Sequence, residues 1–191
     1  MGSGEPDFDT PKNIQQAGIQ AINDGLTRYT PVDGTTDLKN AIIDKFKRDN
    51  NLNYSLTEVM VSSGGKQVFY NLCQSVINPG DEVVIPSPFW VSYPDMVLLA
   101  DGVPVIVETG IEENFKISPE QLENAITDRT KLFVINSPSN PTGAVYSKEE
   151  LVALAKVLER HPHVMVITDD IYEHIRGTMI LTTIYGWLIH L

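Results

Sequence analysis

The chain has 191 residues, of which 42% are hydrophobic, so it can bury one substantial core. Its 14 basic and 25 acidic residues give a net charge of −11, which argues against a nucleic-acid-binding surface or attachment to anionic lipid. A single cysteine, Cys73, excludes an internal disulfide, and its place in an apolar helical pattern predicts a buried thiol in a reducing compartment, the cytoplasm.

The two ends of the sequence differ from the rest in composition. The first residues, MGSGEPDFDTP, lack the basic start and apolar stretch of a secretory signal, and Pro6 does not fit a myristoylation pattern. Residues 177–191, GTMILTTIYGWLIHL, contain no Lys, Arg, Asp or Glu. This stretch is shorter than the roughly 20 apolar residues that span a bilayer, so it predicts a buried strand or an abnormal tail.

Residues 1–56 predict an N-terminal helical segment. Thr10 and Pro11 are typical of a cap and a first helical position, and Gly25 of a stop. The apolar face of this first helix comprises Ile14, Ala17, Ala21 and Ile22. A second helix is expected to start at a cap formed by Thr36 or Asp37. Its inner stripe comprises Leu38, Ile42 and Phe46, and it ends in the polar break 48–51.

Residues 57–176 predict a sheet-containing domain, because short apolar runs alternate with helical segments. The predicted strands are Val59–Val61, Glu82–Ile85, Val103–Val107, Leu132–Ile135 and Val164–Thr168. Between them, Lys66–Ile77 predicts a helix with Val68, Leu72, Cys73 and Val76 on one side. Ser118-Pro119 opens a further helix, and Ser147 with Glu150 forms the capping box of another. This alternation predicts an α/β fold: a mostly parallel sheet with helices on both faces and function at the carboxyl ends of the strands.

The segment Ser62-Ser63-Gly64-Gly65-Lys66-Gln67 lies between a predicted strand and a predicted helix. Its glycines let backbone amides approach a ligand, and a helix N-terminus favours an anion. The segment therefore predicts a phosphate cradle, although its glycine spacing fits neither a P-loop nor a dinucleotide fingerprint. The alternative is a tight strand-to-helix turn with a solvated Lys66.

Aromatic residues follow the next predicted strand in the segment Pro88-Phe89-Trp90-Val91-Ser92-Tyr93. An aromatic face at this position could stack on a flat heterocycle. The alternative is that Trp90 is a core or half-buried packing residue, which is the usual place of a tryptophan.

Turn-forming residues follow a later strand in the segment Asn136-Ser137-Pro138-Ser139-Asn140-Pro141-Thr142-Gly143. Asn140 precedes a proline and is held away from helical geometry, so a rigid loop can aim its amide at a ligand above the sheet. The alternative is an ordinary loop with an Asn-Pro turn.

A carboxylate ends an almost wholly apolar strand in the segment Thr168-Asp169-Asp170-Ile171-Tyr172-Glu173-His174. A charge there needs a partner, and the protonated ring nitrogen of a cofactor would serve, with Tyr172 bonding to the same ring. The alternative is a metal held by Asp169 and Asp170. Consecutive strand residues face opposite sides, and no His/Cys cluster joins them, so no metal site is predicted.

Taken together and in this order, the motifs resemble the class I aminotransferases of the pyridoxal-phosphate superfamily, in the branch related to prokaryotic-type aspartate aminotransferases. The resemblance runs from Gly4 to about Arg176. The segments that carry it are GEPDFDTP (4–11), YTPVDG (29–34), GGKQ (64–67), PGDEV (79–83), WVSYP (90–94), NPTG (140–143) and DDIYEH (169–174). The resemblance implies part of a fold type I large domain, pyridoxal 5'-phosphate as cofactor, and amino acid and 2-oxo acid substrates.

The resemblance also implies how the cofactor is held. Gly64, Gly65 and Lys66 would bind its phosphate, and Trp90 would stack on its pyridine ring. Tyr29 would reach the cofactor phosphate of the neighbouring subunit, because these enzymes are homodimers with shared active sites.

The remaining implied contacts concern the ring and the substrate. Asp169 would pair with the protonated ring nitrogen, and Asn140 and Tyr172 would contact the phenolic oxygen. Gly4 would lie beside the substrate carboxylate, with Trp90 and Asn140 lining the substrate site.

Three parts of the family pattern are not found in the sequence. The family's Schiff-base lysine follows the aspartate and the tyrosine, but the last lysine here is Lys156, and no other residue is predicted to be catalytic. The carboxylate-binding arginine, which Arg176 does not match, and the C-terminal small domain are also missing. The tail 177–191 no longer resembles the family. We therefore expect an aminotransferase by family whose activity, in this chain, is low or absent.

Three alternatives remain open. The same fold and cofactor support lyase or synthase chemistry on an amino acid. The chain could instead be a catalytically dead fragment that binds the cofactor, or an interaction module that pairs with a full-length chain through the Tyr29 region. An unrelated nucleotide-binding α/β domain is disfavoured by the glycine spacing.

Overall fold

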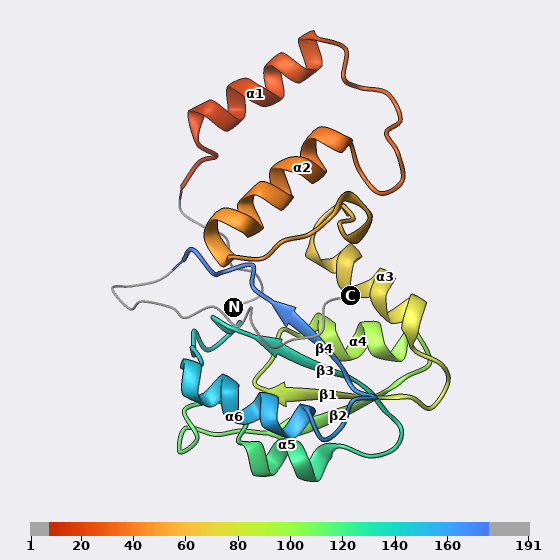
Figure 1. The fold of residues 1–191 in the computed structure, drawn as a ribbon, viewed down its shortest axis with the longest axis vertical. Coiled ribbons are helices and arrows are strands. Elements are labelled where there is room, and N and C mark those ends of the chain that lie inside the picture. The colour runs from red at the N-terminus through yellow and green to blue at the C-terminus, as the bar shows by residue number, and fades with distance from the viewer. Residues whose placement is uncertain (1–7, 176–191) are drawn as a thin grey trace.

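A computed structural model describes residues 8–175 of the chain (Figure 1). Its sheet has four strands: β1 (Glu82–Ser87), β2 (Val103–Glu108), β3 (Thr130–Asn136) and β4 (Met165–Asp169). The strand order is β2-β1-β3-β4, and every neighbouring pair is parallel. Each of the four strands overlaps one of the predicted strands, with bounds that differ by at most two residues, and the predicted parallel sheet is confirmed.

Helices cover both faces of the sheet, as predicted. Four helices pack on the sheet. They are α3 (Gly65–Val76), α4 (Ser92–Leu98), α5 (Pro119–Ala125) and α6 (Lys148–Leu158). Figure 1 shows α3 and α4 on one side of the strands and α5 and α6 on the other. The carboxyl ends of all four strands therefore lie at one edge that neither helix layer covers.

Each face of the sheet has its own hydrophobic cluster, because alternate residues of a strand point to opposite faces. One cluster packs α3 and α4 on the sheet and contains Phe69, Cys73, Val83, Ile85, Tyr93, Met96, Val97, Leu132 and Val134. The other packs α5 and α6 and contains Val84, Leu122, Phe133, Ile135, Leu154 and Val157. The central strands β1 and β3 are buried on both sides, which explains their nearly continuous apolar sequence.

The N-terminal part of the described chain is helical, as predicted. It comprises α1 (Lys12–Asn23), α2 (Thr36–Lys45), a π-helical turn η1 (Phe46–Asn50) and a 3₁₀ turn η2 (Leu56–Glu58). The cap of α2 is Thr35, whose hydroxyl accepts from the Leu38 amide at 3.4 Å, and not the predicted Thr36 or Asp37. An N-cap lies outside the helix, and the helical conformation already begins at Thr36.

Two further helix starts follow the predicted chemistry. Ser118 and Gln121 form a reciprocal capping box at α5, and Ser147 and Glu150 form one at α6. At α1 the predicted cap Thr10 and first position Pro11 are one residue too early: Pro11 is the N-cap, because its ψ of 139° is not helical, and no side chain caps the helix. None of the residues of α1 is buried by the described part of the chain.

Besides the caps of α1 and α2, two further predictions about local structure are wrong. Val59–Val61 is extended at Val59 but is not a strand, because no described strand lies beside it and the Val61 amide bonds to the Asp33 carbonyl at 3.0 Å. On α3 the buried residues are Phe69 and Cys73, whereas Val68 is 52% exposed. Val68 precedes Phe69 by one residue, which turns its side chain about 100° away from the sheet.

No helix among residues 8–175 combines the length and the apolar character that crossing a bilayer requires. The predicted tail 177–191 lies outside the described residues.

Candidate functional site

The polar residues singled out in the sequence lie at the carboxyl edge of the sheet. Strand β1 runs into the segment Pro88–Val91, β3 ends at Asn136, and β4 ends at Asp169. The register pairs Asn136 with Asp169, so these two side chains leave the sheet at the same level. Parallel strands bring residues 33 positions apart in sequence to one point of the edge.

The carboxylate of Asp169 is held at both oxygens. The Tyr93 hydroxyl donates to Oδ2 at 2.5 Å, and the Ile171 amide donates to Oδ1 at 3.2 Å. Tyr93 lies on α4 and is 2% exposed. Burial, and then the negative charge of Asp169, raise the pKa of Tyr93 far above its ordinary value of 10.0, so its hydroxyl stays protonated and remains a donor.

Asn136 ties the loop after β3 to β4. Its Nδ2 donates to the Asp169 carbonyl at 2.7 Å, and its Oδ1 accepts from the Asn140 amide at 2.7 Å. These two bonds fix the backbone of Asn140 beside the carboxyl end of β4. The sequence motif included Asn136, but only its register in the sheet reveals this role.

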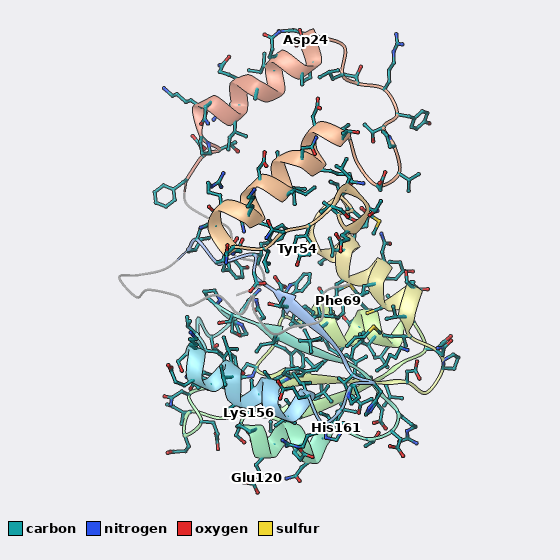
Figure 2. All side chains as sticks on the ribbon, viewed as in Figure 1. Asp24, Tyr54, Phe69, Glu120, Lys156 and His161 are labelled. Atoms are coloured by element: carbon teal, nitrogen blue, oxygen red, sulfur yellow. The ribbon has the colours of Figure 1, made fainter. Side chains whose placement is uncertain are left out.

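Trp90 belongs to an aromatic group between α3 and α4. Its ring meets that of Tyr93 edge to face, with centroids 5.3 Å apart, and the centroid of the Phe69 ring lies 4.9 Å from that of Tyr93. The Lys66 ammonium lies 5.4 Å from the centroid of the Trp90 ring. Figure 2 shows Phe69 between α3 and the sheet. Lys66 and Trp90, predicted for the phosphate and the ring face, are therefore neighbours.

The N-terminus of α3 offers free backbone donors. Gly64 is the N-cap, with φ 92° and ψ 163°, a backbone conformation that residues other than glycine rarely adopt. In the first turn of α3, the first amide with a backbone acceptor is that of Gln67, which donates to the Gly64 carbonyl at 3.1 Å. Within residues 8–175, the Gly65 and Lys66 amides have no backbone acceptor. An anion could accept from them.

A small pocket of about 30 Å³ lies between the carboxyl ends of β1 and β3. Its lining includes Phe89, Tyr93, Asn136, Asn140 and Tyr146. This volume has room for a few water molecules at most, so the pocket is a recess beside the polar groups and too small for a coenzyme.

Of the nine predicted site residues, seven lie at or near this edge, one lies apart from it, and one is outside the described residues. Tyr172 is in the turn after β4, three residues beyond Asp169, and is only partly buried. Tyr29 lies between α1 and α2 and is 107% exposed, so nothing in the described chain covers it. Gly4 lies outside the described residues.

Acidic side chains near the edge do not gather into a metal site. The Asp170 carboxylate accepts from the Thr168 hydroxyl at 2.7 Å, whereas that of Asp169 bonds to Tyr93. Among residues 8–175 there is no group of three His, Cys, Asp or Glu side chains with a metal-binding arrangement.

Comparisons with known proteins agree on one family. The profile described as "Aminotransferase class I and II" matches residues 1–183. The aspartate/prephenate aminotransferase of Nitrosomonas europaea is 62% identical over 175 residues, which cover 92% of this chain and 44% of that protein. The chain thus spans less than half the length of this curated relative.

Solved structures give the same result. The aspartate aminotransferase of Rhizobium meliloti superposes with a TM-score of 0.91 at 48% identity, covering 95% of this chain and 46% of that one. The aspartate aminotransferase of Thermus thermophilus with maleate superposes with a TM-score of 0.91 at 47% identity, covering 95% of this chain and 47% of that one.

Proposed function

The chain belongs to the aminotransferase class I and II family, and from this membership we propose that it forms the cofactor-binding half of an enzyme that transfers an amino group between an amino acid and a 2-oxo acid. Aminotransferases of this family use pyridoxal phosphate. The observation that carries the proposal is the Asp169 carboxylate, held at both oxygens at the carboxyl edge of the sheet.

The donor set at this edge fits pyridoxal phosphate. The Gly65 and Lys66 amides at the start of α3, which follow the N-cap Gly64, and the Lys66 ammonium suit a phosphate group. The Asp169 carboxylate suits a protonated ring nitrogen, and the indole of Trp90 suits the face of a flat ring.

Two side chains of the chain could hydrogen-bond to the phenolic oxygen of the ring. The Asn140 side-chain amide and the Tyr172 hydroxyl can both donate to it. When bound, pyridoxal phosphate supplies an electron-withdrawing ring that stabilises negative charge on the substrate carbon next to the amino group.

An anionic Asp169 would keep the ring nitrogen protonated. Its Oδ2 takes a bond from Tyr93 and its Oδ1 one from Ile171, yet each carboxylate oxygen can accept a second donor. Asp169 can therefore face a ring N–H without losing its support. Asn136 holds the Asp169 main chain, which fixes the carboxylate relative to the loop of Asn140.

The chain alone is proposed to bind the cofactor without a covalent bond and to have little or no turnover. Its last lysine is Lys156, on α6 (Figure 2), and α6 packs on the face of the sheet opposite to Tyr93. No lysine of the chain follows Asp169, so the bond to the cofactor and the proton transfer need a residue from elsewhere.

The substrate class is proposed from the relatives' names. The three relatives reported above are named aspartate or aspartate/prephenate aminotransferases, which favours a dicarboxylic amino acid as donor over lyase or synthase chemistry. The N-terminal part supports a shared active site in a homodimer, since Tyr29 is fully exposed and α1 buries no residue. A sedimentation-velocity measurement that finds only monomers at high concentration would contradict this assembly.

Adding pyridoxal phosphate to the 191-residue chain tests the proposal. We expect a visible absorption change that dialysis reverses, and no single lysine that borohydride links to the cofactor. Asp169→Asn should weaken binding by about 10- to 100-fold, because the carboxylate makes a charge-assisted bond. Asp170→Asn is the matched control, because that carboxylate bonds to Thr168 instead. Saturable binding of nucleotides without binding of pyridoxal phosphate would overturn the proposal.

A further inference from the structure

We propose that Tyr93 is a positioning residue for Asp169, which holds the carboxylate in the orientation that meets the ring nitrogen of the cofactor. This inference rests on the proposed function, and it concerns a residue to which no role was assigned by the resemblance.

The bond between the two side chains has a definite direction. Tyr93 has one hydroxyl proton, and an ionised carboxylate can only accept, so the phenol donates to Oδ2. The two residues stand 76 positions apart, on α4 and at the end of β4. The Ile171 amide holds the other oxygen. Two donors from different elements fix the plane of the carboxylate, which one donor would leave free to rotate.

The side chain of Tyr93 touches Phe69, Trp90 and Asp169, of which Trp90 and Asp169 are proposed to contact the cofactor directly. It packs against Phe69, which lies on the helix that begins with the phosphate cradle. It meets Trp90 edge to face, and its hydroxyl reaches Asp169. A shift of Tyr93 would therefore change the distances between the phosphate site, the stacking face and the carboxylate together.

The hydroxyl adds nothing to the hydrophobic packing of Tyr93. The side chain is 2% exposed, and a phenylalanine would fill the same space without a polar group that needs a buried partner. The other carboxylate near the strand end, Asp170, bonds to Thr168. The phenol is thus specific for the one carboxylate that the proposed function assigns to the cofactor.

The test compares two ligands that differ only at the ring nitrogen: pyridoxal phosphate and its 1-deaza analogue, in which carbon replaces that atom. In the 191-residue chain, Tyr93→Phe should weaken pyridoxal phosphate about tenfold and the deaza analogue less than about twofold. In an Asp169→Asn background, Tyr93→Phe should cause no further loss. The nitrogen-15 resonance of the bound cofactor ring should also move in Tyr93→Phe.

Equal losses for the two ligands would mean that the hydroxyl only supports the fold, and they would overturn the inference. A full loss from Tyr93→Phe in the Asp169→Asn background would overturn it as well. If the unchanged chain binds neither ligand, the proposed function fails and this inference fails with it. That outcome is distinct from binding that Tyr93→Phe does not alter selectively.

Two controls separate positioning from folding. Tyr70→Phe removes a hydroxyl from a tyrosine of α3 that is 40% exposed, and it should change neither affinity. If Tyr93→Phe does not fold, 3-fluorotyrosine at position 93 keeps the ring and changes the acidity of the hydroxyl. With that residue the ring nitrogen-15 resonance should still move, and an unmoved resonance would overturn the inference.

Discussion

Glu173 and Lys45 form an ion pair although they stand 128 residues apart. The Asn50 amide donates to the second carboxylate oxygen of Glu173 at 3.0 Å. Burial by itself would raise the pKa of Glu173, but the bonds from Lys45 and Asn50 outweigh it and lower the pKa below its ordinary value of 4.5. Because Glu173 follows Tyr172, this pair joins the N-terminal helices to the turn that carries a proposed cofactor contact.

Lys45→Met should destabilise the chain by about 1–3 kcal/mol, because it removes the lysine ammonium that pairs with the carboxylate of Glu173, whose side chain is 10% exposed. The methionine keeps most of the apolar stem of Lys45, so packing changes little. Urea unfolding should show a lower midpoint at an unchanged slope.

Lys47→Met is the matched control for this variant. Lys47 lies two residues further along, in the π-helical turn η1 that directly follows Lys45, and is exposed. Its replacement should leave the urea midpoint nearly unchanged. If the two variants lose equal stability, the pair between Lys45 and Glu173 is not what holds this turn.

Glu82→Gln should make stability less dependent on pH in the acid range. The hydrogen bond from Thr127, and then that from Arg129, lower the pKa of Glu82 below its ordinary value of 4.5. Such a group stabilises the folded state above its unfolded pKa and loses this contribution as pH falls through its folded pKa. The variant should therefore be less stable near neutral pH, with a deficit that shrinks below pH 4.5.

Urea titrations of Glu82→Gln at a series of pH values measure this effect. Glu120→Gln, at an exposed position in the first turn of α5, serves as the control (Figure 2). A deficit that stays constant through the acid range would contradict the assignment to Glu82.

Gly64→Ala should lower both stability and cofactor affinity. Gly64 has φ 92°, where an L residue is strained by about 1–2 kcal/mol, and it is the cap of the proposed phosphate cradle. Gly80→Ala is a close control, since Gly80 has φ 89° and, like Gly64, no atom within 4 Å of an added Cβ. It lies just before β1, away from the carboxyl edge.

Both glycine variants should therefore unfold at similarly reduced urea concentrations, and only Gly64→Ala should also weaken pyridoxal phosphate binding. Equal affinities of the two variants for pyridoxal phosphate would argue against a phosphate cradle at Gly64.

Cys73 should resist thiol reagents while the chain is folded. Its side chain is 0% exposed, and burial raises the pKa of its thiol to about 11. We expect an aromatic disulfide reagent to react at mildly alkaline pH only after urea unfolding, with one thiol released per chain. Rapid reaction of the folded chain would show that the packing of α3 against the sheet opens readily.

Local patterns were sufficient to predict the strands and most helix starts. Capping boxes at Ser118 and Ser147 depend on residues only three positions apart, and the apolar runs of β1 and β3 reflect burial on both faces. The prediction of a strand at Val59–Val61 was wrong because a strand requires a neighbouring strand, and a local sequence pattern does not reveal whether one is present.

The candidate site shows the same division. Asp169 and Asn140 could be proposed from the sequence because their signals are local: a charge at the end of an apolar strand, and an amide directly before a proline. Asn136 has no such signal, since its role depends on its pairing with Asp169 across the sheet. The roles of all nine predicted site residues, the division of the chain at residues 56 and 176, and the cytoplasmic location stay predictions.

The sequence by itself determined the family, the parallel α/β fold and the residue types offered to a cofactor, because these depend on local periodicity and on motifs in a fixed order. Only the tertiary structure decided which side chains support them: Tyr93 on Asp169, and Lys45 on Glu173. The reason is geometric. A hydrogen bond needs two atoms within about 3 Å, and the packing of helices on a sheet sets that distance between residues far apart in sequence.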